Sequence, residues 1–248
     1  MGEMVSIITP MYNAQKYIAD TMDSVLAQTY QNWEMIIMDD CSKDGGPDIV
    51  KEYSAKDSRI RYFRNERNQG VSKTRNAAMR KASGRYLAFL DSDDLWDADK
   101  LNVQIKFMRE NDAHFTCTGC RIIDEDGQPT GQVRHIPAKK DYSQMLKGNS
   151  AACLTVVVDR KYIQDPIMPD IPHEDYAAWL NAIKDGEYVY GIDEVLASYR
   201  VNQNSVSGNK VRAALWTWNI YRDYLHIPLF KSIYYFVCYA WNAVAKRI

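Results

Sequence analysis

The sequence predicts an α/β fold in which helices flank a mostly parallel central sheet. Short apolar runs rich in β-branched residues alternate with longer helical stretches through the first half of the chain, which is the pattern of such a sheet. Hydrophobic residues make up 46% and charged residues 25% of the 248 residues, as in an ordinary globular protein. This length suits one large domain, with or without an appendage.

Four apolar runs are expected to form strands, and the segments that follow them are expected to form helices. The strands are expected at residues 5–9, 34–38, 60–63 and 86–90. The helices are expected at residues 17–28, 47–55, 71–82 and 101–110, several of them bounded by turn residues such as Gly45-Gly46-Pro47 and Ser83-Gly84. Beyond residue 110 the pattern is irregular, with a turn at 124–127 and a loop through Lys139 and Lys140.

The composition changes again near residue 208, where a C-terminal segment of two helices is expected. Aromatic residues in it, such as Trp216 and Trp241, are interleaved with six Lys or Arg residues, and Asp223 is the only acid. This composition suits the surface of an anionic membrane. The uncharged run 233–245 is too short to span a bilayer, which needs about 20 residues. The alternative is that these helices pack on the sheet or on a second copy of the chain.

Charge and cysteine usage exclude several classes of protein. The net charge of −1 provides no basic field for nucleic acid, so nucleic acid is not expected as a partner. The first residues lead directly into a predicted strand without a secretory signal, so we expect a cytoplasmic protein. Five scattered cysteines do not form a disulfide framework. Cys117 and Cys120 have metal-type spacing but lack further ligands, so buried strand cysteines are expected.

Three of the predicted strands end in polar clusters, at residues 9–13, 39–42 and 91–94. In open α/β sheets ligands bind beyond the carboxyl ends of the strands. The last cluster brings Asp91, Asp93 and Asp94 together, and a hard divalent cation such as Mg²⁺ or Mn²⁺ would offset their repulsion. The alternative is an acidic turn that caps the next helix together with Asp97 and Asp99.

A basic stretch precedes this acidic cluster. Residues 59–85 contain nine Lys or Arg residues and only one acid, Glu66. A basic stretch that leads into an acidic loop suits a ligand with phosphates and a metal. Most of these side chains are expected to be solvated, and Arg75 is the one that we expect to contact a ligand.

Together these residues closely resemble the family 2 glycosyltransferases, whose nucleotide-diphospho-sugar-binding fold is called GT-A. The matching segments appear in the family's order and cover most of residues 4–207, at 5–13, 24–30, 34–42, 68–76, 84–96, 173–176 and 199–207. The resemblance implies a GT-A domain over 1–207. In it, about 1–110 would bind the nucleotide sugar and about 111–207 would lie on the acceptor side. Residues 208–248 would be a helical extension.

The resemblance also implies roles for single residues in donor binding. Thr9, Pro10 and Tyr12 would wall the nucleoside pocket, and Asp40, with Asp39 beside it, would accept the imide proton of the base. A carboxylate can accept the N3 proton of uracil or thymine, whereas cytosine has none there. Helix capping is the alternative for both aspartates. Asp91 would hold the ribose or the metal, Asp93 would ligate the metal, and Ser92 between them would belong to the donor site. Asp94 would support them.

Catalytic roles are implied in the last two matching segments. Asp175, before a helical run at 176–184, matches the position of the family's general base, which must accept the proton of the acceptor hydroxyl. The alternative is that Glu174 and Asp175 cap the helix, and His173 is expected to be a loop residue. Arg200 would lie near the donor phosphates. Many relatives carry His where this chain has Asn202, so a contact there is in doubt, whereas Ser205 and Ser207 would still reach the diphosphate.

The activity implied is metal-dependent, inverting transfer of a sugar from a nucleotide-diphosphate donor, UDP first, to a hydroxyl of a cell-surface glycan on a lipid carrier. Partners would be the donor, that acceptor, the inner face of the cell membrane and a second copy of the chain. The alternative is a catalytically silent subunit that binds nucleotide sugar or glycan. A sugar-1-phosphate nucleotidyltransferase is disfavoured because residues 5–13 contain no glycine, and a dehydrogenase because no glycine-rich dinucleotide motif follows a strand.

Overall fold

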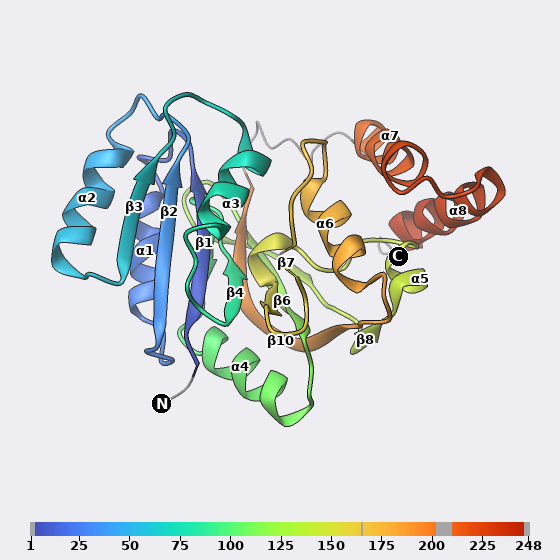
Figure 1. Cartoon of the computed structure of the whole chain (residues 1–248), viewed down its shortest axis with the longest axis horizontal. Coiled ribbons are helices and arrows are strands. Elements are labelled where there is room, and N and C mark those ends of the chain that lie inside the picture. The colour runs from blue at the N-terminus through green and yellow to red at the C-terminus, as the bar shows by residue number, and fades with distance from the viewer. Residues whose placement is uncertain (1–2, 165, 202–209, 246–248) are drawn as a thin grey trace.

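The first half of the chain alternates strands and helices as predicted. In the computed structural model, which describes residues 3–164, 166–201 and 210–245, this half runs β1 (Val5–Met11), α1 (Ile18–Leu26), β2 (Trp33–Asp39), α2 (Gly46–Lys56), β3 (Ile60–Arg64), α3 (Val71–Met79) and β4 (Tyr86–Phe89). Each strand and helix lies within a few residues of its predicted position. The α/β fold class is therefore confirmed (Figure 1).

The second half contains more strands than the sequence pattern indicates. It runs β5 (Leu95–Trp96), α4 (Lys100–Glu110), β6 (Phe115–Ile123), β7 (Pro129–Arg134), β8 (Lys139–Lys140), α5 (Tyr142–Met145), η1 (Cys153–Thr155), β9 (Val157–Asp159), α6 (Glu174–Ile183) and β10 (Val189–Arg200). The turn expected at 124–127 joins β6 to β7, and the segment expected to be a loop at Lys139 and Lys140 is a short strand. Almost all of β6 is buried, so it lacks the alternation that marks a strand covered on one face.

One sheet contains all ten strands of the described residues, in the order β3-β2-β1-β4-β9-β6-β10-β5, with β7 beside β6 and β8 beside β10. Its first four strands are parallel. β9 runs antiparallel to both of its neighbours, β4 and β6, and β6 and β10 are again parallel to each other. The two halves of the chain therefore share one sheet, which places residues from both at the same edge (Figure 1).

Helices cover both faces of this sheet. α1, α2 and α4 pack on one face, and α3 and α6 on the other. Successive residues of β2 alternate between the two cores, so that Ile36 faces α3 and Ile37 faces α1. Trp179 of α6 is fully buried, with its ring edge-on to Phe89 and Phe115 at centroid distances of 5.0 and 5.4 Å. This packing holds α6 over the centre of the sheet.

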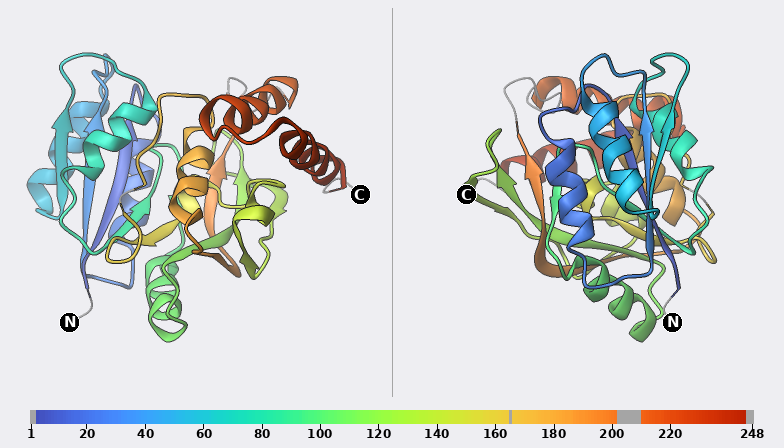
Figure 2. Two further views of the ribbon diagram at one scale, coloured as in Figure 1. Left: turned by 45° about the vertical axis from the view of Figure 1, so that its right-hand side comes forward. Right: turned by 90° about the vertical axis from the view of Figure 1, so that its left-hand side faces the viewer.

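The C-terminal segment forms the two helices that were expected, joined by a π-helical turn. They are α7 (Lys210–Asn219), η3 (Ile220–Tyr224) and α8 (Leu229–Ala245), and they lie at the end of the molecule remote from α2 (Figure 2). Tyr221 is fully buried, donates to the Leu146 carbonyl and lies 3.5 Å from the hydroxyl of Tyr176 on α6. Part of the segment therefore packs on the rest of the chain. Of the helices in the described ranges, none combines the length and the hydropathy needed to cross a bilayer.

A buried lysine at the start of α4 allows a test of this packing by pH. Lys100 is fully buried, its Nζ donates to Gln104 Oε1 at 2.5 Å, and burial lowers its pKa from 10.5 to about 7. Between these pH values the unfolded chain holds one more proton than the folded chain, so the free energy of unfolding should rise with pH. The rise should approach at most about 1.4 kcal/mol per pH unit.

We expect Lys100→Met to abolish this dependence in urea unfolding at a series of pH values. Subtracting the unfolding free energy of the variant from that of the parent isolates the contribution of the lysine. Lys106→Met, which changes an exposed lysine of the same helix, should stay parallel to the parent. Parallel curves for the parent and Lys100→Met would contradict a neutral buried lysine.

Candidate active site

The three polar clusters predicted at strand ends meet at one edge of the sheet. β1 lies between β2 and β4, and all three are parallel. Residues 39–42, 12–13 and 91–94, which end or follow β2, β1 and β4, therefore lie beside one another. α3 and α6 add side chains to this edge from the face that they cover. The predicted strand ends therefore lie together, and the binding of a ligand there stays a prediction.

The turn after β4 concentrates negative charge in a partly buried place. Burial and then the charge of Asp91 raise the pKa of Asp93 to about 6. Burial and then Asp93 raise the pKa of Asp94 well above its ordinary value. One Asp94 oxygen accepts the backbone N–H of Arg200 at 2.8 Å. Asp91, Ser92 and Asp93 are partly exposed, so a ligand can reach them.

This acidic turn does not cap the following helix, which was the alternative considered from sequence. Asp99 is the N-cap residue of α4, but its side chain makes no capping hydrogen bond. Both oxygens of Asp97 accept from Arg121 on β6, at 2.7 and 2.6 Å. The acids at 91–94 therefore lie at the edge of the sheet and do not cap α4.

Arg200, at the end of β10, holds this turn in place. Its Nε donates to the Asp93 carbonyl at 2.7 Å and its Nη1 donates to the Glu125 carbonyl at 3.1 Å, while its guanidinium lies 4.7 Å from the centre of the Tyr17 ring. Only 4% of the residue is exposed. Its Nη2 also pairs with Asp20 at 3.7 Å, and the phosphate contact implied by the family resemblance stays a prediction.

Asp91 and Asp93 have the donor chemistry that Mg²⁺ or Mn²⁺ prefers, since both offer carboxylate oxygens. The two carboxylates lie close together, since the charge of Asp91 raises the pKa of Asp93. A bound cation would relieve the repulsion between them. Among the described residues no group of three or more His, Cys, Asp or Glu side chains forms a ready-made metal site. The two carboxylates would hold such a cation together with oxygens of a substrate.

Arg75 of α3 joins this turn to the start of α6. Its Nη2 lies 2.5 Å from Asp91 Oδ1 and its Nη1 donates to Glu174 Oε1. Arg75 is only 4% exposed. Burial alone would lower its pKa, but the charges of Asp91 and Glu174 outweigh burial and hold that pKa well above the ordinary value. The partners of Arg75 are thus carboxylates of the chain, and the ligand contact predicted for it stays a prediction.

Asp175, next to Glu174 in the first turn of α6, is the best-placed candidate base. Burial and then the charge of Glu174 raise its pKa to about 7, while Arg75 acts in the opposite direction. One oxygen accepts the N–H of Tyr176 at 2.7 Å, so the capping alternative is partly present. His173 precedes it with φ of +58°, a left-handed conformation that turns the chain into the helix.

Cys153 is a member of this cluster that sequence reasoning missed. It lies in η1, and the charges of Arg75, Asp91 and Asp175 all influence the pKa of its thiol. Burial raises its pKa well above the ordinary value, so the thiol is neutral. The apolar run around it, Ala151 to Leu154, gives no signal that distinguishes it from a core cysteine.

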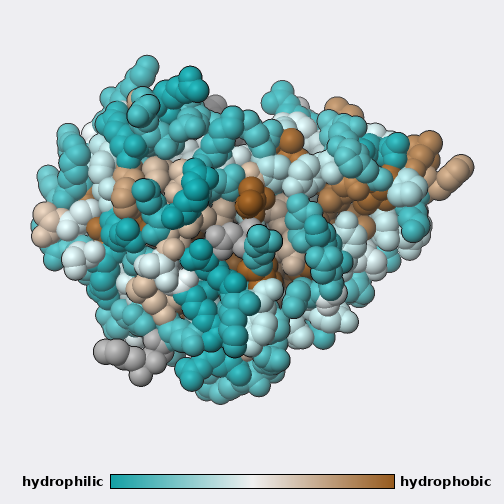
Figure 3. Space-filling model, viewed as in Figure 1, coloured by the Kyte–Doolittle hydropathy of each residue, from teal (hydrophilic) through white to brown (hydrophobic). Residues whose placement is uncertain are grey.

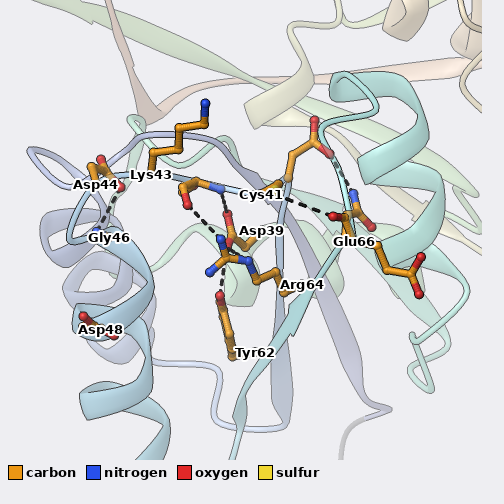
Figure 4. A network of polar contacts seen from close by, with 12 residues as sticks. Asp39, Cys41, Lys43, Asp44, Gly46, Asp48, Tyr62, Arg64 and Glu66 are labelled. Atoms are coloured by element: carbon orange, nitrogen blue, oxygen red, sulfur yellow. Dashed lines mark hydrogen bonds and ion pairs between the residues drawn. The ribbon is translucent and has the colours of Figure 1, made fainter.

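Asp39, at the end of β2, is buried and fully engaged by the protein. It accepts from the Ser42 N–H and the Tyr62 hydroxyl, each at 2.8 Å, and pairs with Arg64 at 3.5 Å (Figure 4). Burial and then Asp39 raise the pKa of Tyr62 to about 12, so the phenol stays a donor. Asp39 therefore supports the local fold.

Asp40 holds the segment that leads into α3 and does not cap a helix, since neither α2 nor α3 has a side-chain cap. It accepts the N–H groups of Gln69 and Gly70, at 2.9 and 2.8 Å, before α3, and the Asn65 side chain at 2.8 Å. The Gln69 N–H also lies 3.1 Å from the second oxygen of Asp40, so each of its two oxygens accepts two hydrogen bonds from the protein. A hollow of about 610 Å³ lies beside it, lined by residues 67–70 and Lys73.

The remaining predicted residues are distributed as follows. Thr9 and Pro10 of β1 are buried, whereas Tyr12 is 49% exposed. Asn202, Ser205 and Ser207 lie outside the described residues. Cys117 and Cys120 are buried in β6, as expected.

Comparisons with known proteins agree with this architecture. Residues 6–159 match the profile of the family described as glycosyl transferase family 2. The chain is 46% identical over 246 residues to TuaG of Bacillus subtilis (strain 168), a glycosyltransferase provisionally assigned to teichuronic acid biosynthesis, covering 99% of this chain and 98% of TuaG. It is 39% identical over 245 residues to WfgD of Escherichia coli, a UDP-Glc:α-D-GlcNAc-diphosphoundecaprenol β-1,3-glucosyltransferase, covering 98% and 95%.

Solved structures share the fold at low sequence identity. S. aureus TarS 1–349 in complex with UDP-GlcNAc superposes with a TM-score of 0.73 at 22% identity, covering 90% of this chain and 65% of that chain. The mannosyltransferase PcManGT from Pyrobaculum calidifontis, in complex with GDP-Man and Mn²⁺, gives a TM-score of 0.73 at 17% identity, covering 96% and 70%. These similarities establish the GT-A fold.

The bridge formed by Arg75 predicts a large effect on stability. Arg75→Ala would leave Asp91 and Glu174 without their shared cation in a poorly hydrated place, a change that costs about 3 kcal/mol or more when a buried ion pair is broken. Urea unfolding measures this loss. Arg80→Ala, at the exposed end of the same helix, is the matched control and should change stability little. A loss of similar size in both variants would show that the two ion pairs add no stability beyond that of an exposed arginine.

Proposed function

The chain belongs to glycosyl transferase family 2, and on this basis we propose that it transfers a sugar from a UDP-sugar to an acceptor hydroxyl with inversion at the anomeric carbon. The observation that carries this proposal is the connection, through Arg75, between the acidic turn at Asp91 and the helix start that bears Asp175. A donor-side cluster and a carboxylate of raised pKa are thereby held at one edge of the sheet.

Asp175 would act as the general base. A sugar hydroxyl is a weak nucleophile at neutral pH, and a positioned carboxylate can take its proton as the new bond forms. A base works best when its pKa lies near the working pH, and burial raises the pKa of Asp175 to about 7. The hydroxyl oxygen then attacks the anomeric carbon as the bond from this carbon to the diphosphate oxygen breaks, which inverts the configuration.

Asp91 and Asp93 would hold the divalent cation, Mn²⁺ or Mg²⁺, of a metal-dependent transferase. When bound, such an ion supplies neutralisation of the charge that develops on the departing diphosphate. PcManGT was solved in complex with Mn²⁺, which supports this assignment by analogy of fold. Ser92 lies between the two aspartates, and Arg200 fixes the backbone carbonyl of Asp93.

The donor would be a UDP-sugar whose base lies near Asp40 and Tyr12. An imide N–H would share the Asp40 carboxylate with its present donors, Asn65, Gln69 and Gly70, near the hollow at residues 67–70. Thr9, Pro10 and Asp39 would shape the pocket from beneath, since all three are buried. WfgD is named for UDP-Glc and TarS was solved with UDP-GlcNAc, whereas PcManGT was solved with GDP-Man.

The acceptor would be a cell-surface glycan carried on a lipid. WfgD is named for a diphosphoundecaprenol-linked acceptor, and TuaG is named for teichuronic acid biosynthesis. Such an acceptor places the reaction at the inner face of the cell membrane. Asp93 and Asp175 in this arrangement disfavour the alternative of a catalytically silent binding subunit.

Metal-dependent nucleotide binding tests the role of Asp93. We expect Asp93→Ala to remove the gain in UDP affinity that Mn²⁺ provides, because one of two proposed ligands is lost, while the thermal unfolding profile is kept. Titration calorimetry of UDP with and without Mn²⁺ measures both affinities. Asp126→Ala, an exposed acid on the β6–β7 turn, is the control. An unchanged effect of Mn²⁺ in Asp93→Ala would refute the metal assignment.

Asp175→Asn tests the base. The amide is nearly isosteric but accepts no proton, so the transfer rate should fall by roughly a hundredfold or more while UDP affinity is kept. In the parent, the rate should rise with pH through about 7 as Asp175 loses its proton, and this rise should vanish in the variant. Asp185→Asn, an exposed acid just beyond α6, should behave as the parent. Near-parental transfer by Asp175→Asn would show that the base lies elsewhere.

A further inference from the structure

Helix α8 packs through one face on the part of the chain that the structure describes, and it exposes a row of large apolar side chains on the other face. The inward face consists of Ser232, Tyr235, Phe236 and Tyr239, which are buried or half-buried. The outward face consists of Phe230, Ile233, Tyr234, Val237 and Trp241, all of which are exposed. The outward residues recur at spacings of three and four, so they form one stripe along the helix.

The exposed stripe is unusual for its size and composition. Phe230 is 87% and Trp241 is 72% exposed, and hydrophobic surface gathers at this end of the molecule (Figure 3). Single exposed apolar residues are common on proteins, whereas a contiguous row of large ones marks an interaction surface. The stripe is largely left to solvent, and at its edge Tyr234 contacts the Lys147 ammonium.

The inward face fixes the orientation of α8, so the stripe cannot turn inward without unpacking. The ring of Phe236 lies edge-on to Trp218 at 5.4 Å, and that of Tyr235 lies edge-on to Tyr221 at 6.5 Å. Asn242 also donates to the Lys147 carbonyl at 3.0 Å. The sequence-based alternative of packing is therefore correct for one face of the helix and leaves the other unexplained.

The charges around the stripe favour a negatively charged binding partner. Lys231 is exposed beside Phe230, and the Lys147 ammonium lies 5.5 Å from the centre of the Tyr234 ring. From residue 209 to the C-terminus the sequence has six Lys or Arg and one acid, although the whole chain carries −1. Positive charge is thus concentrated in the segment that exposes the stripe, which is the pattern of helices that lie on anionic lipid surfaces.

We propose that the outward face of α8 docks on an anionic lipid bilayer, with the helix axis parallel to the membrane plane. At 1.5 Å per residue the helix is about 25 Å long, shorter than the roughly 30 Å hydrocarbon core, so it lies on the bilayer. Phe230, Val237 and Trp241 enter the interfacial region, and the lysines at the rim contact lipid headgroups. A second copy of the chain fits less well, because it would bring two positively charged segments together.

This surface is connected to the candidate active site through α7. Trp216 of α7 lies edge-on to His173, the residue before Glu174 and Asp175, at 5.1 Å. Docking would therefore hold the start of α6 at a set place relative to the bilayer. The orientation toward a lipid-linked acceptor rests on the proposed function, whereas docking itself does not.

Vesicle binding by the full chain tests the proposal, without donor or acceptor. Sedimentation with vesicles of phosphatidylcholine mixed with phosphatidylglycerol is compared with vesicles of phosphatidylcholine alone. We expect binding to the mixed vesicles that weakens with salt. Phe230→Ser with Trp241→Ser should weaken that binding by about a hundredfold, since two aromatic side chains leave the apolar phase.

The matched control is Val133→Ser with Ile167→Ser, which removes exposed apolar residues remote in sequence from α8. It should sediment as the parent does. Surface changes are sharper here than deletion of α8, because deletion would also remove the inward face. Thermal unfolding and UDP binding should be the same in the parent and in both double variants, so that a failure of docking is distinguished from a failure of the donor site.

Three results would overturn the proposal. One is a parent chain that ignores mixed vesicles at low salt, and another is equal sedimentation of the parent and the variant with two outward-face changes. The third is a dimer, seen by sedimentation velocity, that the same two changes dissociate. The last result would assign the stripe to an interface between two copies of this chain.

Discussion

The two ion pairs of Arg75 are the interaction on which the candidate active site depends. Asp91 follows a strand in the first half of the chain and Glu174 opens a helix in the second half, and one buried guanidinium serves both. Two carboxylates and one cation leave a net negative charge at this place, so removal of the cation would set the acids against each other. The two ion pairs of Arg75 thereby connect the acidic turn to the helix start that bears Asp175.

The continuous sheet makes that balance possible. β9 and β6 extend the parallel half without a break, and β10 returns beside β6 to deliver Arg200 beneath the acidic turn. The turn is thereby held from two sides, by Arg75 on α3 and by Arg200 on β10. Elements that are far apart in the sequence thus restrict the same four residues, which explains how several like charges remain close together.

Local patterns predict most of the parallel half of the fold, but they do not predict the contacts between distant residues. The runs that form β1 and β2 are β-branched and bounded by turns, and Asp91 and Asp175 follow from the strand-end rule and the family resemblance. Buried strand cysteines were expected at 117 and 120, but the bounds of β6 were not predicted, because Thr116, Thr118 and Gly119 interrupt its apolar residues. Neither the pairing of Arg75 with Glu174 nor the turning of Arg200 toward carbonyl groups has a local sequence signal. The two faces of α8 differ only in tertiary packing.

One helix carries groups from both parts of the site. Asp40 accepts the N–H groups of Gln69 and Gly70 just before α3, and Arg75 lies in the second turn of that helix. A ligand that changed the hydrogen bonds of Asp40 would alter the free energy of the helix position, and with it the two ion pairs of Arg75. Thermodynamic linkage is reciprocal, so a change at α6 would alter the affinity at Asp40 by the same factor. Coupling between Asp40 and Arg75 would thus follow from the hydrogen bonds that hold the segment before α3.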